Sequence, residues 1–330
     1  MADWQSRRVP LVVLTMLLAL GLAACGGDQD SEPAPAEDTA SAAAPDTTAT
    51  PAGGAAASDT TPITVEDAGL ETPESVLYEE RDDVYLVSNI NGTPTDTDDN
   101  GFIARISPDG TVEQLRWIDA AASEDVTLNA PKGLALKGDT LFVTDIDAVR
   151  ACDLTTGAPL TSWQVPGATF LNDLVVDADG TLYVSDSGLN PDFSSSGTDA
   201  IYRFEGGRPV AVIADTALHR PNGLAARNGE LLVAPFASNQ VLRVTAGGDS
   251  VETVATLPGG QLDGIVRLDD GSLLVSSWET QTVYRIPVDG APVAVVEDVT
   301  SPADIGYDPQ RRRVLIPVFN ENRLELRPVR

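Results

Sequence analysis

The sequence predicts an all-β fold, a six-bladed β-propeller with four-stranded antiparallel blades, over residues 71–330. Three observations support this prediction. Glycine (28 residues) and proline (23 residues) separate short runs of Val, Leu and Ile, whereas helical periodicity is scarce. One pattern recurs at intervals of 58, 40, 50, 41 and 40 residues, which suits propeller blades. Asp-Gly or Asn-Gly pairs at 179–180, 228–229 and 270–271 mark tight turns inside three of the copies.

Each copy of the pattern contains a small polar pair, an apolar run, a turn and a second apolar run, which ends in residues such as Ser-Asp. The two apolar runs are expected to form the first two strands of a blade, and one or two strand-like segments follow each copy. A β-sandwich is the alternative all-β architecture. The six copies span residues 73–89, 131–145, 171–186, 221–235, 262–277 and 302–317.

The polar pair that opens each copy is expected to lie at the centre of the propeller, because the first strand of a blade is its innermost strand. Five of the six pairs contain Glu, Asp or Asn. Oxygen atoms that converge in this way repel one another unless a cation lies between them. The sequence therefore predicts a divalent metal site, with Ca²⁺ as the expected ion and Zn²⁺, Mn²⁺ or Mg²⁺ as alternatives. The pairs are Glu74-Ser75, Lys132-Gly133, Asn172-Asp173, Asn222-Gly223, Asp263-Gly264 and Ala303-Asp304.

Two long insertions follow the second strand of a copy, at residues 89–100 and 187–199. The first strand leaves the face that carries the polar pairs and the second strand returns to it. The loops after the second strands should therefore cover the predicted site. We expect them to contact substrate or to act as a lid; tolerated surface insertions are the alternative.

The domain resembles the regucalcin/gluconolactonase family of six-bladed propellers, which includes senescence marker protein. Four tetrapeptides carry the resemblance, at residues 73–76 (PESV), 171–174 (LNDL), 221–224 (PNGL) and 262–265 (LDGI). In that family a glutamate, the asparagine of an Asn-Gly pair and the aspartate of an Asp-Gly pair bind one divalent metal. The matching residues here are Glu74, Asn222 and Asp263. A further asparagine of the family, placed at the substrate or the metal, matches Asn172.

The resemblance also implies roles for individual residues. Asp263 would bind the metal and act as, or position, the general base, which makes it the predicted catalytic residue. Asn172 and Asp173 would contact substrate, and His219, three residues before Asn222, is a further candidate for substrate binding. Glu71 is the alternative to Glu74 for the family's glutamate. The arginine with which some sugar-lactone enzymes hold substrate has no clear counterpart.

The predicted function is divalent-metal-dependent hydrolysis of a small lactone or ester. The alternative is a non-catalytic propeller that binds a ligand or a protein and holds a structural calcium. A net charge of -29 excludes nucleic acid as a partner, and one histidine cannot build a three-histidine zinc site. The sequence contains no Gly-x-Ser-x-Gly motif of a serine hydrolase. The expected partners are a small-molecule substrate and a membrane lipid, and the protein is expected to be a monomer.

Residues 1–25 are predicted to be a lipoprotein signal peptide. Arg7 and Arg8 precede a short apolar run, and the run ends in Leu-Ala-Ala-Cys, a sequence that resembles a lipobox. The predicted lipidated residue is Cys25; an ordinary secretory signal is the alternative. Residues 26–70 are rich in Ala, Pro and Thr and contain acids but no Lys or Arg, which predicts a disordered tether. The expected location is the cell envelope. The lipid is expected to anchor the protein in the outer membrane, and the protein either lies on the periplasmic face or is exported.

Two other residue types are expected to have structural roles. With Cys25 acylated, Cys152 has no disulfide partner and should pack as a small apolar side chain. Trp117, Trp163 and Trp278 lie near predicted strand ends and should pack in the core or between blades.

Overall fold

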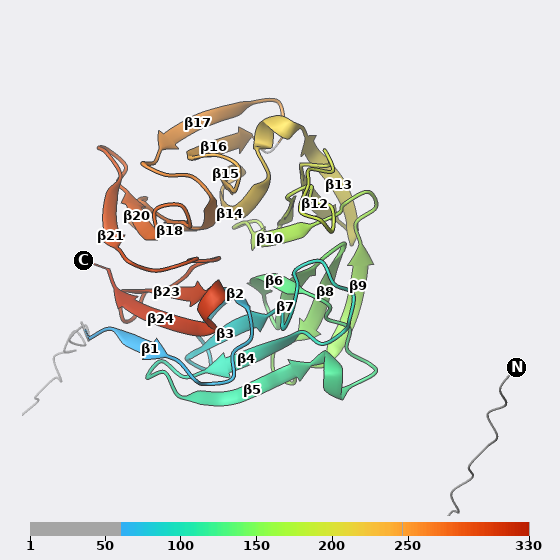
Figure 1. The fold of residues 1–330 in the computed structure, drawn as a ribbon. Helices are drawn as coiled ribbons and strands as arrows, with labels where there is room; N and C mark the ends of the chain where they lie inside the picture. Colours follow the sequence, from blue (N-terminus) through green and yellow to red (C-terminus); the bar gives the residue numbers. More distant parts are fainter. Residues whose placement is uncertain (1–60, 246, 330) are drawn as a thin grey trace, which may run out of the picture. The chain divides into compact units, whose positions relative to one another are not determined.

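The computed structural model of the chain describes residues 61–245 and 247–329. These residues form six four-stranded antiparallel sheets around a central axis, which confirms the predicted six-bladed β-propeller (Figure 1). The predicted signal peptide, the lipidation site Cys25 and most of the predicted tether lie outside the described residues. None of the described residues belongs to a helix long and apolar enough to cross a membrane.

In blades 1 to 5, four consecutive strands pair in chain order. Blade 1 contains β2 (Pro73–Glu79), β3 (Val84–Asn89), β4 (Phe102–Ile106) and β5 (Val112–Asp119). Blade 2 contains β6 (Pro131–Lys137), β7 (Thr140–Asp145), β8 (Ala148–Asp153) and β9 (Pro159–Gln164). Blade 3 contains β10 (Leu171–Val176), β11 (Leu182–Asp186), β12 (Ala200–Glu205) and β13 (Arg208–Ala214).

Blade 4 contains β14 (Pro221–Arg227), β15 (Glu230–Pro235), β16 (Gln240–Thr245) and β17 (Val251–Thr256). Blade 5 contains β18 (Leu262–Arg267), β19 (Leu273–Ser277), β20 (Thr282–Ile286) and β21 (Val293–Val296). Blade 6 contains β22 (Gly306–Asp308), β23 (Arg313–Val318), β24 (Arg323–Pro328) and, from the other end of the domain, β1 (Ile63–Val65). Short 3₁₀ helices η1 (Ala120–Ala122), η2 (Thr216–Leu218) and η3 (Phe319–Glu321) lie in the connections.

The hydrophobic core lies between blades. The described residues contain six clusters of buried apolar side chains, and each cluster joins two neighbouring blades. Cys152 is 3% exposed, forms no disulfide and packs in the cluster between blades 1 and 2, as predicted. Trp117 packs against the same cluster and Trp163 against the next one. The first strands of neighbouring blades contact one another, so their starts meet near the axis.

Strand β1 corrects the predicted domain boundary. It pairs with β24 in antiparallel register, with Val65 opposite Leu324, and so closes the ring of blades. Ile63, Val65 and Leu70 fall in the segment 26–70 that is predicted as a tether, yet Val65 and Leu70 are 5% and 2% exposed. The tether prediction is therefore wrong from Ile63 onward. Three scattered apolar residues in a polar stretch give no period, and their burial depends on a partner strand at the far end of the chain.

We expect a chain that begins at residue 71 to be less stable than one that begins at Thr61, which retains β1. Burial of Val65 and Leu70 contributes about 1.5–3 kcal/mol for each side chain. In a domain of this size 1 kcal/mol corresponds to roughly 2–4 °C, so the melting temperature should fall by about 10 °C. Thermal unfolding of the two chains measures the difference, and equal melting temperatures would contradict the proposed closure.

Candidate functional site

A local irregularity in each blade places the polar pair at the axis. In blades 1 to 5 the register between the first two strands shifts across the pair, as between Leu171 and Leu174 in blade 3 and between Leu262 and Ile265 in blade 5. Such bulges interrupt the ladder and turn side chains out of the regular alternation of a strand. The residues of the pair therefore project toward the centre of the molecule.

A hydroxyl group on the second strand replaces the backbone hydrogen bonds that the bulge removes. Ser185 Oγ accepts from the Asp173 backbone N–H at 3.0 Å and donates to the Asn222 carbonyl of the next blade at 2.7 Å. Ser276 repeats this arrangement between blades 5 and 6. Ser185 and Ser276 thus each hold two neighbouring polar pairs in place.

Glycine follows two of the site residues because neighbouring first strands approach too closely for a side chain. A Cβ on Gly223 would lie 2.2 Å from the carbonyl oxygen of Asp263. A Cβ on Gly264 would lie 2.2 Å from the backbone nitrogen of Ile305. The Asn-Gly and Asp-Gly pairs therefore combine a polar side chain for the site with the close packing that brings the blades together.

Four buried oxygen atoms in one cavity have no hydrogen-bond partner: Glu74 Oε2, Asn172 Oδ1, Asn222 Oδ1 and Asp263 Oδ1. The four residues are 3% to 6% exposed. An unpaired buried polar atom costs about 1–3 kcal/mol, and more if it is charged. A ligand that is positively charged or rich in donors would remove this cost. The set consists only of oxygen, and so it fits a hard cation such as Ca²⁺.

Half of this oxygen set is uncharged. The described residues contain no cluster of three or more His, Cys, Asp or Glu side chains that could hold a metal ion. The oxygen set is not such a cluster, because only two of its four members are carboxylates. Glu74 and Asp263 are the two carboxylates of the set, and Asn172 and Asn222 contribute amide oxygens. Two negative charges would balance one divalent cation.

Burial and mutual repulsion raise the pKa of both carboxyl groups well above their ordinary values. For Glu74 the largest cause is burial, followed by the charges of Asp263 and Asp304. For Asp263 the causes are burial and then the charge of Asp304, opposed by the side chains of Trp278 and Asn222. Burial also raises the pKa of Asp304 to about 7, against the hydrogen bond from Ser75. The centre of the molecule is therefore electrostatically unfavourable without a cation.

Lys132 lies in the same cavity but is not the counterion of the oxygen set. Its ammonium donates to the Ala130 carbonyl at 3.0 Å and lies 4.4 Å from the centre of the Phe170 ring. Burial lowers the pKa of Lys132 to about 8, and the charges of Glu74 and Asp145 oppose this shift. A neutral carbonyl and an aromatic ring thus hold the ammonium at the cavity wall, outside ion-pair distance of the carboxylates.

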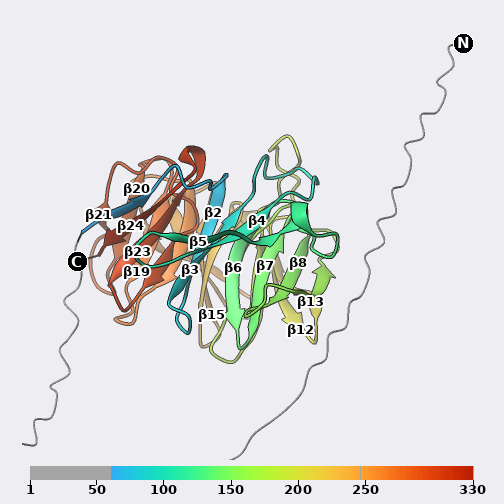
Figure 2. The ribbon, with the colours of Figure 1, turned by 90° about the horizontal axis from the view of Figure 1, so that it is seen from below.

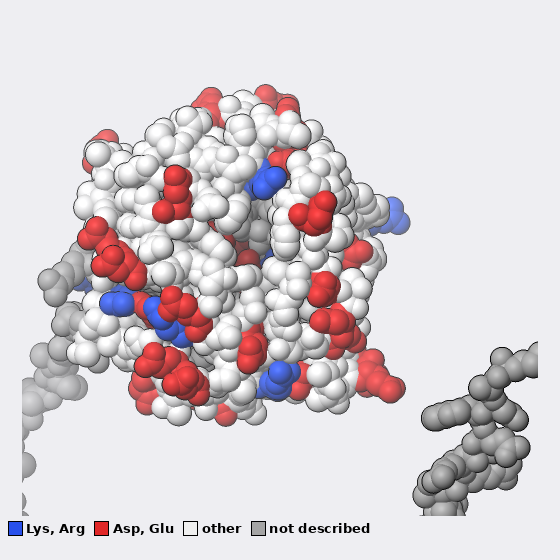
Figure 3. All heavy atoms as spheres, viewed as in Figure 1, with Lys and Arg blue, Asp and Glu red and all other residues white. Residues whose placement is uncertain are grey.

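The cavity has a volume of about 260 Å³ and combines this polar floor with apolar walls. The space-filling view shows a hollow near the centre of the face, with acidic atoms at its base (Figure 3). Both predicted loops border it: Pro94 comes from residues 89–100, and Leu189 and Phe193 come from residues 187–199. The loops rise over the same face (Figure 2), and Thr95 Oγ1 donates to the Pro191 carbonyl at 3.5 Å.

Three predicted residues are not in this cavity. Asp173 lines a second cavity, because its neighbour Asn172 occupies the position that faces the first. His219 is exposed and ends the 3₁₀ helix η2, whereas the next residue, Arg220, lines the cavity. Glu71 is exposed and accepts a hydrogen bond from Asn322, so Glu74 is the glutamate at the site.

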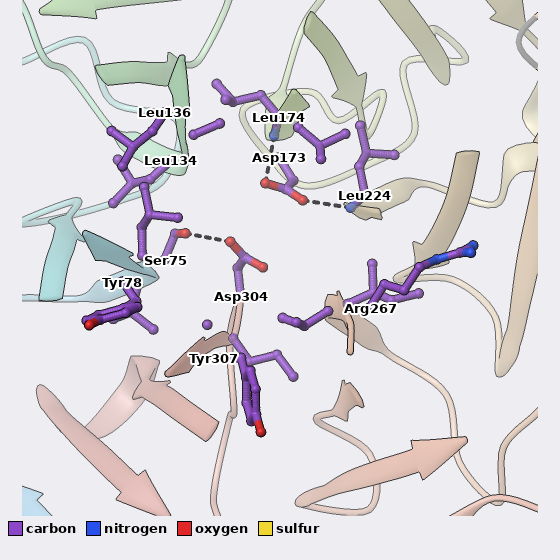
Figure 4. A pocket seen from close by; sticks show the side chains of 18 of the residues that line it. Ser75, Tyr78, Leu134, Leu136, Asp173, Leu174, Leu224, Arg267, Asp304 and Tyr307 are labelled. Atoms are coloured by element: carbon purple, nitrogen blue, oxygen red, sulfur yellow. Dashed lines mark hydrogen bonds between the residues drawn. The ribbon is translucent and has the colours of Figure 1, made fainter. Parts of the chain in front are cut away.

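The second cavity, of about 510 Å³, lies along the first strands on the other side of the polar pairs (Figure 4). Its carboxylates already have donors. Asp173 accepts from the backbone N–H groups of Leu174 and Leu224, both at 2.6 Å, and Asp304 accepts from Ser75 Oγ at 2.5 Å. This larger cavity is therefore a weaker candidate for a cation site.

Six residues that line the first cavity were not predicted from the sequence as binding residues: Lys132, Phe170, Arg220, Phe236, Trp278 and Phe319. The sequence did contain a signal that Lys132 lies at the site, because Lys132 holds the same position in its copy of the repeat as Asn172 and Asp263 hold in theirs. For Trp278 the expectation of simple packing was incomplete, since the ring also forms part of the cavity wall.

Residues 72–306 match the family model described as SMP-30/gluconolactonase/LRE-like region. The chain belongs to this family. Membership confirms the resemblance drawn from the four tetrapeptides, and the match begins two residues before Glu74 and includes all four residues of the oxygen set. No curated protein is similar enough in sequence to match this SMP-30/gluconolactonase-like chain.

Solved structures of similar fold include a gluconolactonase from Xanthomonas campestris, with 21% identity, 82% of this chain and 89% of that chain covered, and a TM-score of 0.65. A calcium-binding regucalcin from Agrobacterium tumefaciens shares 17% identity over 80% and 92% of the two chains, with a TM-score of 0.56. A streptogramin B lyase shares 12% identity over 81% and 96%, with a TM-score of 0.59. At these identities the likeness concerns the fold alone.

The raised pKa values predict how the stability of the cation-free protein depends on pH. An acid whose pKa is higher in the folded state binds its proton more tightly there. The folded state therefore loses stability as pH rises from the unfolded pKa through the folded pKa. With Asp304 at about 7 and Glu74 and Asp263 raised well above their ordinary values, the melting temperature in a chelator should fall between pH 5 and pH 8.

Addition of Ca²⁺ should restore more stability at pH 8 than at pH 5, because the cation competes with protons for the same oxygen atoms. Glu74→Gln should flatten the fall in the chelator and weaken the response to Ca²⁺. Thermal unfolding across this pH range measures both effects. A melting temperature that rises steadily with pH in the chelator would contradict the arrangement of charges described here.

Proposed function

We propose that this protein is a divalent-cation-dependent hydrolase of a small lactone or ester. The observation that carries the proposal is the set of four buried, unpartnered oxygen atoms at the floor of one open cavity. A purely structural propeller has no need to bury such a set at a site that a small molecule can enter. Membership of the SMP-30/gluconolactonase-like family supports the same activity.

Glu74, Asn172, Asn222 and Asp263 would hold the cation, with Ca²⁺ as the proposed ion. When bound, a divalent cation polarises an ester carbonyl and stabilises the negative charge that develops on its oxygen. The hydrogen bond from Asn172 Nδ2 to Ser187 Oγ, at 3.1 Å, orients the amide so that its oxygen faces the cavity. The position of this ligand is therefore set before substrate enters.

Asp263 is the proposed general base. Water adds to the carbonyl carbon, the proton leaves the water for the Asp263 carboxylate, and the bond from the carbonyl carbon to the ring or ester oxygen breaks. The proton then passes to that leaving oxygen. Asp263 is 3% exposed and lines the cavity, so its carboxylate can meet a water molecule held beside the carbonyl. The ammonium of Lys132 adds a positive charge at the wall, where it favours the anionic product.

Asp263→Asn should lower kcat/KM for a cleaved lactone by about a hundredfold or more. The substitution keeps the shape of the side chain and removes a buried charge, so the melting temperature in a chelator should not fall. Asp270→Asn is the matched control, since Asp270 lies in the turn of the same blade, with a side chain that is 55% exposed and paired to Arg285 on the surface.

Assays with and without Ca²⁺ decide between catalysis and simple binding. Hydrolysis that depends on both the cation and Asp263 supports the enzyme. A protein that gains stability from Ca²⁺ but cleaves neither lactones nor esters is the alternative, a binding module with a structural calcium. Full activity of Asp263→Asn would remove Asp263 from the mechanism.

The proposal extends to the location of the protein. The Leu-Ala-Ala-Cys sequence before residue 26 supports lipidation of Cys25 and attachment to the cell envelope. We expect the full chain, expressed in a bacterium, to fractionate with membranes. Cys25→Ser should abolish this association and remove the mass that the lipid adds to the protein. Membrane association that survives the substitution would show that the lipid is not the anchor.

A further inference from the structure

The walls of the cavity arise from a second repeated position, distinct from the polar pairs. The residue directly after the second strand of a blade lines the cavity in five blades. Four of these five residues are apolar, and three are aromatic. In blades 1, 3, 4, 5 and 6 they are Ile90, Ser187, Phe236, Trp278 and Phe319.

The three aromatic residues form one continuous surface across three blades. The ring centres of Phe236 and Trp278 are 5.7 Å apart with an edge-to-face orientation, and those of Trp278 and Phe319 are 5.3 Å apart. These contacts hold the rings in place and leave one side of the surface facing the cavity. We call Phe236, Trp278 and Phe319 the aromatic wall.

The opposite side and the mouth of the cavity are also apolar. Phe170 is 6% exposed and lines the cavity beneath the ammonium of Lys132. Phe193, on the loop of residues 187–199, is 46% exposed, although large apolar side chains usually lie inside a protein. An exposed phenylalanine at the mouth, above an aromatic wall, extends the apolar surface toward an entering ligand.

Polar groups above the floor are few, and most of them only donate hydrogen bonds. Ser187 Oγ already donates to the Pro221 carbonyl at 2.8 Å and accepts from Asn172. Lys132, Arg220 and the indole N–H of Trp278, which has no partner, are the other polar groups of the wall and mouth, and all three only donate. Above the floor the several hydroxyls of a buried sugar lactone would share one acceptor, the free lone pair of Ser187 Oγ, and each hydroxyl without an acceptor reduces affinity roughly tenfold or more.

From these observations we infer that the cavity takes a small lactone or ester with an apolar alkyl or aryl substituent, and not a polyhydroxylated sugar lactone. The carbonyl lies at the oxygen floor and the substituent lies against the aromatic wall and Phe193. The inference rests on the proposed function for the reaction, but the apolar walls argue for it independently of catalysis. The cavity of about 260 Å³ limits the substituent to a short chain or one ring.

Three lactones that share a six-membered ring test the inference: δ-valerolactone, δ-nonalactone and glucono-δ-lactone. With the full chain and excess Ca²⁺, kcat/KM should rise about threefold to fourfold for each added methylene until the cavity is filled. We expect δ-nonalactone to exceed δ-valerolactone by tenfold or more. Glucono-δ-lactone should be the poorest of the three after subtraction of its spontaneous hydrolysis.

Phe193→Ser should lower kcat/KM for δ-nonalactone by about fivefold to tenfold and have a much smaller effect on that for δ-valerolactone. Phe193 is exposed, so the substitution removes no core packing. Val288→Ser is the matched control, because Val288 is 69% exposed and does not line the cavity. An equal loss on both lactones, or no loss on either, would show that Phe193 does not contact the substituent.

Binding separates this inference from the proposed function. Tryptophan fluorescence reports occupancy beside Trp278 without turnover. Binding of δ-nonalactone in preference to glucono-δ-lactone, with no hydrolysis of either, supports the apolar cavity and overturns the hydrolase. Faster hydrolysis of glucono-δ-lactone than of δ-nonalactone overturns the apolar cavity and leaves the hydrolase intact. If δ-nonalactone is neither bound nor hydrolysed, the inference is overturned.

Discussion

The burial of Glu74, Asn172, Asn222 and Asp263 with unpaired oxygen atoms is the constraint on which the site depends. The propeller can bury them because first strands meet at the axis, where glycines such as Gly223 and Gly264 allow backbones to touch. The bulges point the side chains inward, and hydroxyls such as that of Ser185 satisfy the backbone groups that the bulges leave free. The fold thus satisfies the backbone around the site and leaves these four side-chain oxygens of the cavity to a ligand.

Two positions of one repeat build two chemically different layers of the cavity. The start of the first strand supplies the polar floor, and the residue after the second strand supplies the walls. A propeller brings equivalent positions from all blades to one circle, so a small change in each repeat alters the whole ring. In this chain the floor is suited to a cation and a carbonyl, whereas the aromatic wall is suited to an apolar substituent. In the proposed enzyme, the reaction type and the substrate preference would therefore be carried by separate sets of residues.

Much of the candidate site could be predicted because it repeats. Glu74, Asn172, Asn222 and Asp263 occupy one position in four copies, and a repeated position defines a circle before any coordinates are known. Predictions from neighbours in sequence were less successful. His219 and Arg220 are adjacent, but the left-handed turn at the end of η2 leaves the histidine in solvent and brings the arginine to the cavity. Asp173 adjoins Asn172, but its carboxylate lines the second cavity, where the backbone N–H groups of Leu174 and Leu224 hold it.

The sequence by itself determined the number of blades, the turn positions and the oxygen set, because each is encoded within a copy of some 15 residues. Only the tertiary structure decided how β1 closes the ring, since Ile63 and its partner Leu326 lie at opposite ends of the domain. It also decided the character of the cavity walls. Phe193, Phe236 and Trp278 resemble ordinary core residues along the chain, and only their meeting above the floor distinguishes an apolar binding surface from a packed interior.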